Sequence, residues 1–326
     1  MLIKEDTVQK NIKLEIFDDN LAIYGKSLLS ILLKDRTTGK NIIWATDDYI
    51  QLGEIYRAEN EISLNTVNGG NEKFIRPRIT KSYEKQNDRT KEKAEVFTPS
   101  WVCNQQNNLV DEKWFGTKNV FNIAEDKSWI TNNKKIEFPD TKNKTWQNYI
   151  DARRMEITCG EAPYLVSRYD TVTGEIINLK SRIGLLDRKM RVVNENTNNE
   201  NEWFKWTERA FQSIYGFEFQ GDNLLLAREN LLCTFIDNIK DKLEREPSLN
   251  ELKRIATIIS WNIWQMDGLT FSVPLSENRE EYEQISLFDS FEDFNKKLEP
   301  KYCKIKNWRS NIVIEYRSMM EERKYG

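Results

Sequence analysis

The chain has 326 residues, of which 39% are hydrophobic and 31% charged, and its formal net charge is −3. This composition predicts a globular protein with a sizeable core and about two domains. Because the chain contains no histidine, it excludes Ser-His-Asp triads, Cys-His pairs and HExxH zinc sites. Any general base must be Asp, Glu, Lys, Tyr or an equivalent group.

The cysteines and the first residues predict a cytoplasmic protein. The four cysteines are far apart and none forms a Cys-x-x-Cys pair, which disfavours a zinc or redox motif and is typical of reduced cytosolic thiols. The opening residues MLIKEDTVQK lack the apolar stretch of a secretion signal. No run of 18 apolar residues occurs, so no membrane-spanning segment is expected.

Residues 1–93 are predicted to form an N-terminal accessory region. A period-two pattern favours a strand over residues 11–17, and an apolar run favours a buried helix over residues 21–33. A turn then precedes a strand-like stretch at residues 41–45. The acids Asp47, Asp48 and Glu54 raise the alternative of a nuclease metal site. No carboxylate-x-Lys partner follows at useful spacing, so surface carboxylates are favoured.

A basic segment ends this region. Between residues 73 and 93, eight Lys and Arg residues face three acids. Such an excess is suited to contacts with DNA phosphates, and a solvated linker or helix face explains it equally well. The residues predicted to contact DNA are Arg76, Arg78, Lys81 and Arg89.

The next stretch begins with Phe97-Thr98-Pro99. Proline disfavours helix before it, so a helix is expected to start after Pro99. Val102, Gln106, Leu109 and Val110 share one stripe of this helix. Residues 112–148 look irregular. Their tryptophans are interpreted as packing residues rather than as platforms for DNA bases.

The stretch at residues 153–165 predicts a strand, a tight turn and a helix start. Met155 and Ile157 supply the strand, Thr158 to Glu161 the turn, and Pro163 the first helical turn. Such a turn presents backbone N–H groups to a polar or anionic ligand. Gly160 allows the backbone to approach that ligand closely.

Two further units follow. A buried strand at residues 213–219 ends in Glu218, and a glycine turn then leads to a helix at residues 224–242. An acid at the end of a strand beside a glycine turn is how α/β folds bind ribose hydroxyls, although a capping or salt-bridge role is the alternative. Another helix starts near Ser248 and leads to a third strand or its approach, closing at Asp267.

These segments together resemble the S-adenosylmethionine-dependent adenine-N6 methyltransferases of DNA restriction–modification systems, in particular the group described as restriction endonuclease subunit M. Glu95-Val96-Phe97-Thr98-Pro99 resembles the first cofactor motif, and Glu156 to Ala162 resembles the glycine-rich loop. Glu218 resembles the ribose-binding acid, and Asp267 resembles the acid near the adenine ring.

The resemblance implies an α/β fold with a Rossmann-like class I methyltransferase sheet over residues 94–326, interrupted by an insertion at about 170–210. It implies S-adenosylmethionine as cofactor, methyl transfer to adenine N6 in double-stranded DNA, and no metal. The cofactor-binding residues it implies are Phe97, Thr98, Pro99, Thr158, Cys159, Gly160, Glu161, Glu218 and Asp267.

The chain departs from the family at two places. Ala162 stands where the family has a second glycine, and no Pro-Pro occurs anywhere, so the catalytic Asn/Asp-Pro-Pro-aromatic motif is missing. No catalytic residue is therefore assigned. A degenerate methyltransferase fold that binds DNA or cofactor without transferring methyl groups is the main alternative.

Partner chains are a further expectation. A restriction or specificity subunit would complete the system. The pentapeptide Gln284-Ile285-Ser286-Leu287-Phe288 resembles the short peptide by which bacterial DNA enzymes bind the sliding clamp, although ordinary packing of its apolar residues is the favoured reading.

Overall fold

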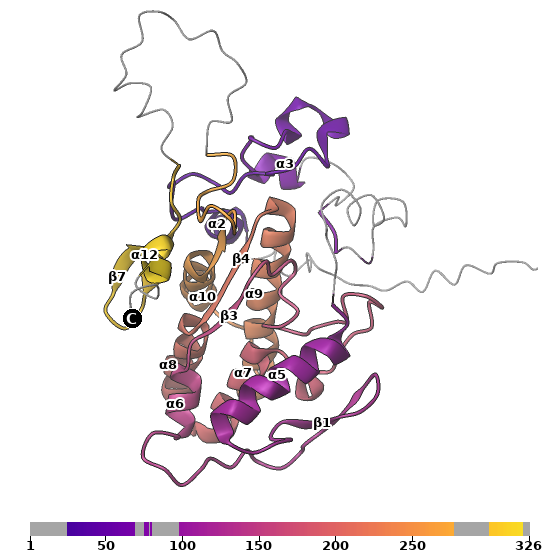
Figure 1. Ribbon diagram of the computed structural model, residues 1–326, viewed down its shortest axis with the longest axis vertical. Coiled ribbons are helices and arrows are strands. Elements are labelled where there is room, and N and C mark those ends of the chain that lie inside the picture. Colours follow the sequence, from indigo (N-terminus) through magenta and orange to yellow (C-terminus); the bar gives the residue numbers. More distant parts are fainter. Residues whose placement is uncertain (1–24, 69–74, 78, 80–97, 277–299, 322–326) are drawn as a thin grey trace, which may run out of the picture.

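The structure, a computed structural model, describes residues 25–68, 75–77, 79, 98–276 and 300–321 (Figure 1). Its helices and strands are α2 (Lys26–Leu32), the 3-10 helices η1 (Ile50–Leu52) and η2 (Glu54–Tyr56), α3 (Leu64–Asn68), α5 (Ser100–Phe115), β1 (Asn122–Ala124), β2 (Trp129–Thr131), α6 (Trp146–Asp151), β3 (Arg154–Glu156), η4 (Leu179–Ser181), α7 (Leu185–Asn196), α8 (Glu200–Gln212), β4 (Ile214–Glu218), α9 (Gly221–Leu243), α10 (Leu249–Asn262), β5 (Ile263–Gln265), β6 (Lys304–Asn307), β7 (Ile312–Glu315) and α12 (Tyr316–Glu321). The fold is mixed α/β with small sheets.

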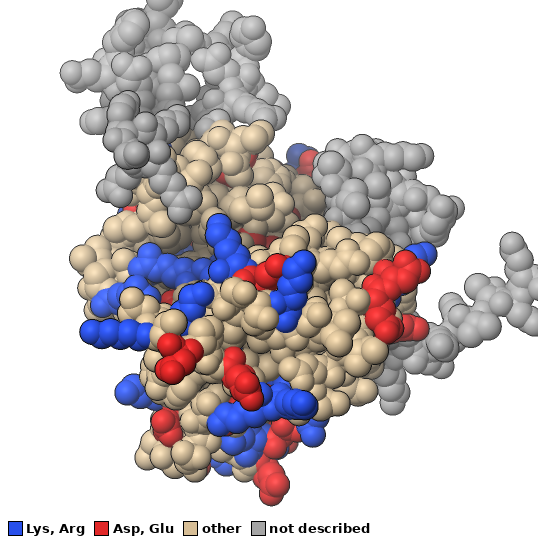
Figure 2. Space-filling model, turned by 60° about the horizontal axis from the view of Figure 1, so that its bottom comes forward, with Lys and Arg blue, Asp and Glu red and all other residues tan. Residues whose placement is uncertain are grey.

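The described surface carries charges of both signs. Figure 2 shows Lys and Arg side chains interspersed with Asp and Glu side chains on one face. Several of these charges form ion pairs, such as Arg254 with Glu208 at 2.7 Å. On this face, opposite charges therefore lie close enough to one another for partial neutralisation.

The central sheet has three parallel strands in the order β3-β4-β5. Arg154 pairs with Ile214, and Phe217 pairs with Trp264. Parallel neighbours need crossover connections. Helices α7 and α8 connect β3 to β4, and helices α9 and α10 connect β4 to β5. The carboxyl ends of all three strands therefore lie at one edge of the sheet.

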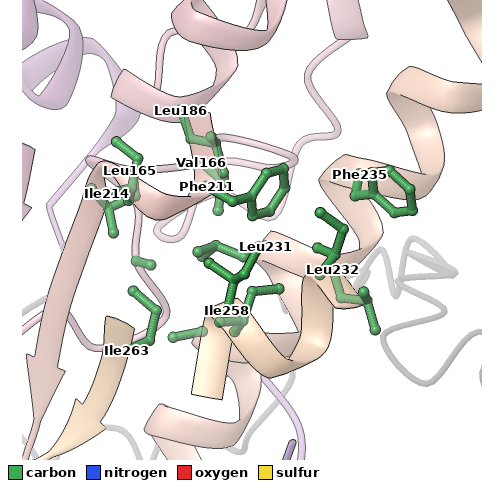
Figure 3. Packing of buried hydrophobic residues seen from close by; sticks show 14 of the residues in the cluster. Leu165, Val166, Leu186, Phe211, Ile214, Leu231, Leu232, Phe235, Ile258 and Ile263 are labelled. Atoms are coloured by element: carbon green, nitrogen blue, oxygen red, sulfur yellow. The ribbon is translucent and has the colours of Figure 1, made fainter. Parts of the chain in front are cut away.

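The two faces of this sheet have different covers. Ile214 and Ile263 pack into the main core with residues of α7 to α10 and of the turn after β3 (Figure 3). Tyr215, Phe217 and Trp264 point to the other face, where residues from β6, β7 and α12 cover them. This alternation follows the period-two direction of side chains along a strand. The sequence patterns thus predicted the strands that build the sheet.

The N-terminal segment packs into the same core. Leu28 and Leu32 of α2 belong to the main cluster. Arg228 of α9 donates to the carbonyl of Ile263 at 2.8 Å and to the carbonyl of Lys34 at 3.1 Å. Burial lowers the pKa of this guanidinium to about 9. The predicted boundary at residues 93 and 94 and the strand predicted at 11–17 lie outside the described residues.

Helix α5 begins after Pro99 as predicted, but its buried face is polar. The stripe of Val102, Gln106, Leu109 and Val110 is not the packing face, because Gln106, Leu109 and Val110 are exposed and Val102 is half-buried. The buried positions are instead Ser100, Cys103, Asn104, Asn107, Asp111 and Phe115. Buried polar residues need hydrogen-bond partners, and α7 provides one in Arg188, which pairs with Asp111 at 2.6 Å.

Other local predictions also differ from the structure. Pro163 lies in a turn and not in a helix, since the next α-helix starts at Leu185. Residues 112–148 are not wholly irregular, because they contain the hairpin of β1 with β2. The stretch predicted as an insertion contains α7 and most of α8. Residues of both helices belong to the main core.

Gly184, the N-cap of α7, allows a close approach of two chain segments. A Cβ atom on this residue would lie 2.3 Å from the carbonyl oxygen of Leu165. We expect Gly184→Ala to lower the free energy of unfolding by about 1–3 kcal/mol, because overpacking a core forces backbone shifts. Urea unfolding checks this value.

A second substitution separates this mechanism from side-chain crowding. Leu165→Ala in the Gly184→Ala background is not expected to restore stability, because the obstacle is a backbone oxygen. An unchanged unfolding midpoint for Gly184→Ala, or recovery in the double variant, would contradict the prediction.

Candidate cofactor pocket

A cavity of about 950 Å³ lies at the carboxyl ends of β3 and β4. Several separate parts of the chain line it, among them the N-terminal segment, α5, the turn after β3 and the turn after β4. The residues predicted from sequence that line it are Thr98, Thr158, Cys159, Gly160 and Glu218. The carboxyl edge of a parallel sheet is where α/β proteins bind ligands.

The turn after β3 is anchored to β4. Cys159 donates its backbone N–H to the carbonyl of Phe217 at 2.8 Å, and its side chain is 2% exposed. Thr158 and Gly160 have φ angles of +46° and +53°, and Ala162 has φ +64°. Left-handed angles of this kind favour glycine. The turn is therefore tight and directs its backbone into the cavity wall.

Glu218 is oriented by two backbone groups. Its Oε2 accepts the N–H of Gly160 at 2.8 Å, and its Oε1 accepts the N–H of Gln220 at 3.1 Å. Glu218 is 7% exposed and lines the cavity. A carboxylate oxygen offers two lone pairs. A side chain held in this way is suited to accept hydrogen bonds from two neighbouring hydroxyl groups.

A second carboxyl group, Glu156 at the end of β3, also lines the cavity. It accepts the N–H groups of Tyr164 at 3.3 Å and of Leu165 at 3.1 Å. Burial raises the pKa of Glu156 well above its usual 4.5. The two backbone N–H groups act in the opposite direction, and the nearby charge of Glu218 adds to the increase. Glu156 belongs to the stretch that resembles the glycine-rich loop, but the resemblance predicts no binding role for it.

The raised pKa predicts a pH dependence of stability. A carboxyl group whose pKa is higher in the folded state stabilises the protein below the unfolded value of 4.5, and this contribution is lost as the pH rises through the folded pKa. We expect Glu156→Gln to match the wild type at low pH and to become the more stable protein as the pH rises. Urea unfolding between pH 4 and pH 8 measures this difference.

Glu175→Gln is the matched control, because that side chain is exposed. We expect its stability curve to run parallel to that of the wild type. Parallel curves for Glu156→Gln as well would show that Glu156 does not titrate differently in the folded protein.

Other predicted residues do not line the cavity. Pro99 is the N-cap of α5. Glu161 is 1% exposed and accepts a 2.5 Å hydrogen bond from the hydroxyl of Tyr169. Asp267 accepts the N–H of Leu269 at 2.8 Å in a turn after β5. Phe97 lies outside the described residues.

The cavity includes residues that the sequence reasoning did not identify. Ala45 and Thr46 come from the N-terminal segment, and Gln106 and Val110 come from the exposed stripe of α5. No local sequence signal distinguishes Ala45 and Thr46. The stripe of α5 is visible in the sequence, but the sequence does not show that the opposite, polar face of the helix is the buried one.

The mouth of the cavity is apolar. Val110, Met155, Ile157 and Leu275 line it and are 37%, 44%, 63% and 48% exposed. A grouped apolar surface of this kind is typical of a site that a ligand or a partner covers. The site thus combines an acidic floor with an apolar rim.

The buried thiol of Cys159 is not suited to act as a nucleophile in this site. Burial raises the pKa of Cys159 well above its usual range, with a further contribution from the charges of Glu156 and Glu218. A protonated thiol is a poor nucleophile. Among the residues that the structure describes, no group of three His, Cys, Asp or Glu side chains is placed to hold a metal ion. Asp47 instead accepts the N–H of Ala58 at 2.9 Å.

The predicted DNA and partner segments are mostly outside the described residues. Arg76 is described and exposed, whereas Arg78, Lys81 and Arg89 are not described. The pentapeptide at residues 284–288 is also outside. The mixed charges on the face in Figure 2 give no separate indication of a DNA-binding surface. None of the described helices is long and apolar enough to cross a membrane.

Comparisons of the chain with protein-family models, with curated proteins and with solved structures found no match.

Proposed function

We propose that the cavity binds S-adenosylmethionine and that the chain is a DNA modification protein acting on adenine N6 within a restriction–modification system. The observation that supports this most is the convergence of Thr98, the turn at residues 158–160 and Glu218 on one cavity. The motif resemblance implies a cofactor-binding role for each of these residues. Residues from chance matches to unrelated motifs would not be expected to line the same cavity.

The geometry fits a nucleoside cofactor. A cavity of about 950 Å³ is large enough for a ligand of this size. The strand order β5-β4-β3 is that of the first half of a doubly wound sheet, which supports the finer proposal of a Rossmann-like methyltransferase fold. Glu218 would accept the two ribose hydroxyls, and the turn at residues 158–160 would lie along the methionine end.

The left-handed angle of Ala162 supports the correspondence with the glycine-rich loop. Its φ of +64° is a conformation that glycine adopts without cost. Alanine here retains the backbone shape of the loop at a cost in strain of about 1 kcal/mol. The substitution in the motif is therefore compatible with the same turn.

The proposed reaction suits a chain without histidine. When bound, S-adenosylmethionine supplies an electrophilic methyl group. The protein must position the adenine amine in line with that group and exclude water, which requires alignment rather than a strong base. Because the Asn/Asp-Pro-Pro-aromatic motif is missing, we propose that a restriction or specificity subunit supplies the amine-activating group. The apolar rim of the cavity is a surface that such a subunit or a flipped base would cover.

Two measurements test the proposal. Calorimetry with S-adenosylhomocysteine tests cofactor binding by the full chain, and methyl transfer to adenine-containing duplexes tests catalysis with and without partner subunits. We expect micromolar binding and transfer only in the presence of a partner. Absence of binding would refute the cofactor site, and absence of transfer with every partner would refute the catalytic role.

A second candidate function follows from the missing tetrapeptide. In this case the chain is a degenerate methyltransferase fold that binds cofactor or DNA as a subunit and transfers no methyl group. Binding of S-adenosylhomocysteine without transfer under any pairing would favour this function.

A further inference from the structure

The segment at residues 43–49, called the strap below, forms one wall of the cavity. Its Ala45 and Thr46 line the cavity together with Phe219 and Gln220 from the turn after β4 and Asn223 from the first turn of α9. The strap is at least 170 residues from that turn in sequence. Its position must therefore be fixed by tertiary contacts.

Gln265, the last residue of β5, makes the main contact with the strap. Its side-chain amide accepts the N–H of Ile43 at 2.9 Å and donates to the carbonyl of Ile43 at 2.8 Å. The same Nε2 donates to the carbonyl of Phe219 at 2.9 Å. Gln265 is 1% exposed. The amide thus pairs with the strap as a peptide unit of a neighbouring strand would, and joins it to the turn that follows Glu218.

Two further contacts hold the strap to the start of α9. Gly221 donates its N–H to the carbonyl of Trp44 at 3.1 Å, and a Cβ on Gly221 would lie 2.0 Å from the carbonyl oxygen of Ile43. The hydroxyl of Tyr49 donates to Asp222 at 2.9 Å. These contacts leave the strap little freedom to move away from the cavity.

The sheet order determines which part of a ligand the strap would face. The turn at residues 158–160 follows β3, whereas Gln265 ends β5, and β4 with Glu218 lies between them. A nucleoside whose ribose binds Glu218 and whose side arm lies over residues 158–160 must place its base on the β5 side. That side is walled by the strap and by Phe219 and Gln220.

We propose that the strap is the wall that selects the base of the cofactor, and that Gln265 is the positioning residue that holds it in place. The inference rests on the proposed function, because it assumes a nucleoside at Glu218. It adds a specificity element from the N-terminal segment, which the motif resemblance does not include.

Calorimetry on the full chain with two probes tests this inference. S-adenosylhomocysteine and S-inosylhomocysteine differ only at the base edge, where an amine is replaced by a carbonyl. We expect the wild type to prefer the adenosyl probe about tenfold or more, as loss of one or two hydrogen bonds predicts. Gln265→Leu removes all three hydrogen bonds of the side-chain amide and keeps a similar side-chain volume. In this variant we expect the preference for the adenosyl probe to shrink to less than about threefold.

Tyr49→Phe provides a second variant in case Gln265→Leu does not fold. It removes one hydroxyl at the far end of the strap, and we expect it to reduce the preference in the same direction. Gln105→Leu is the matched control, because it makes the same chemical change at an exposed position outside the strap. We expect it to leave the preference unchanged.

The ratio of the two affinities separates positioning from general stability. A destabilised fold would weaken both probes equally, whereas a displaced strap changes the ratio. A wild type without preference, or a ratio in Gln265→Leu or Tyr49→Phe equal to that of the wild type, would refute the inference alone. Binding of neither probe by the wild type would refute the proposed function together with the inference.

Discussion

Asp111→Ala is expected to lower the free energy of unfolding by about 3–5 kcal/mol, the largest stability effect that we predict. Asp111 and Arg188 form an ion pair at 2.6 Å, and their side chains are 3% and 1% exposed. Asp111 also accepts the hydroxyl of Tyr149 at 2.9 Å. Removing the carboxylate leaves a buried guanidinium without its counter-charge.

The expected effect is large because the Asp111→Ala substitution leaves the charge of Arg188 buried without an anion beside it. The ion pair itself contributes less than this penalty. Arg188 would retain hydrogen bonds to Asn104 and Asn108, both at 2.8 Å, and its position over the ring of Phe121. These neutral partners do not replace an anion beside a buried guanidinium. Urea unfolding at neutral pH measures the loss.

A double-mutant cycle tests this reasoning. We expect the double substitution of Asp111→Ala with Arg188→Met to be less destabilising than the sum of the two single substitutions, because it removes both charges. Asp111→Asn, which keeps shape and an acceptor for Tyr149, is expected to lose less than Asp111→Ala. Additive single effects would show that the two charges do not interact in the folded protein.

Glu218→Ala is expected to weaken binding of S-adenosylhomocysteine about 100-fold, since two hydrogen bonds to a charged acceptor together contribute roughly 3 kcal/mol. The side chain is aligned before binding by the N–H groups of Gly160 and Gln220. Its loss also removes a support of the turn at residues 158–160. The measurement is calorimetry with the full chain.

Controls distinguish a lost ligand contact from a lost turn. Glu218→Gln keeps one acceptor oxygen and is expected to bind about tenfold more weakly than the wild type. Glu175→Ala, at an exposed position, should bind as the wild type does. Thermal unfolding of each variant monitors the fold. Unchanged affinity in a folded Glu218→Ala protein would exclude Glu218 from the site.

Several elements were predictable because their signals are local. The run at residues 214–218 is buried at every position, and a continuous apolar run before a glycine turn is typical of a central parallel strand. The helix that follows begins at Gly221 and ends at Leu243. Helix α2 (Lys26–Leu32) lies within the stretch where the apolar run predicted a helix.

Distant partners decide two features that local signals do not show. Helix α5 turns Asn104 and Asp111 inward, where Arg188 bonds to both, and it turns Asn107 inward, where its amide donates to the carbonyls of Tyr164 and Ile183. After Gly160, the expected helix start at Pro163 is replaced by turns. The carboxyl group of Glu156 accepts the N–H groups of Tyr164 and Leu165. These backbone donors therefore have hydrogen-bond partners without forming a helix.

Local sequence patterns predicted the strand–turn units around Gly160 and Glu218, and the absence of histidine excluded several catalytic chemistries. Hydrophobic periodicity and turn residues act over a few positions, so they are readable in one sequence. The contact of Glu218 with the N–H of Gly160 and the position of the strap at the cavity become visible in the folded chain alone. The tertiary structure also placed Asp267 in a turn outside the residues that line the cavity. These contacts join residues far apart in the chain, and a buried polar group does not specify in the sequence which distant partner will satisfy it.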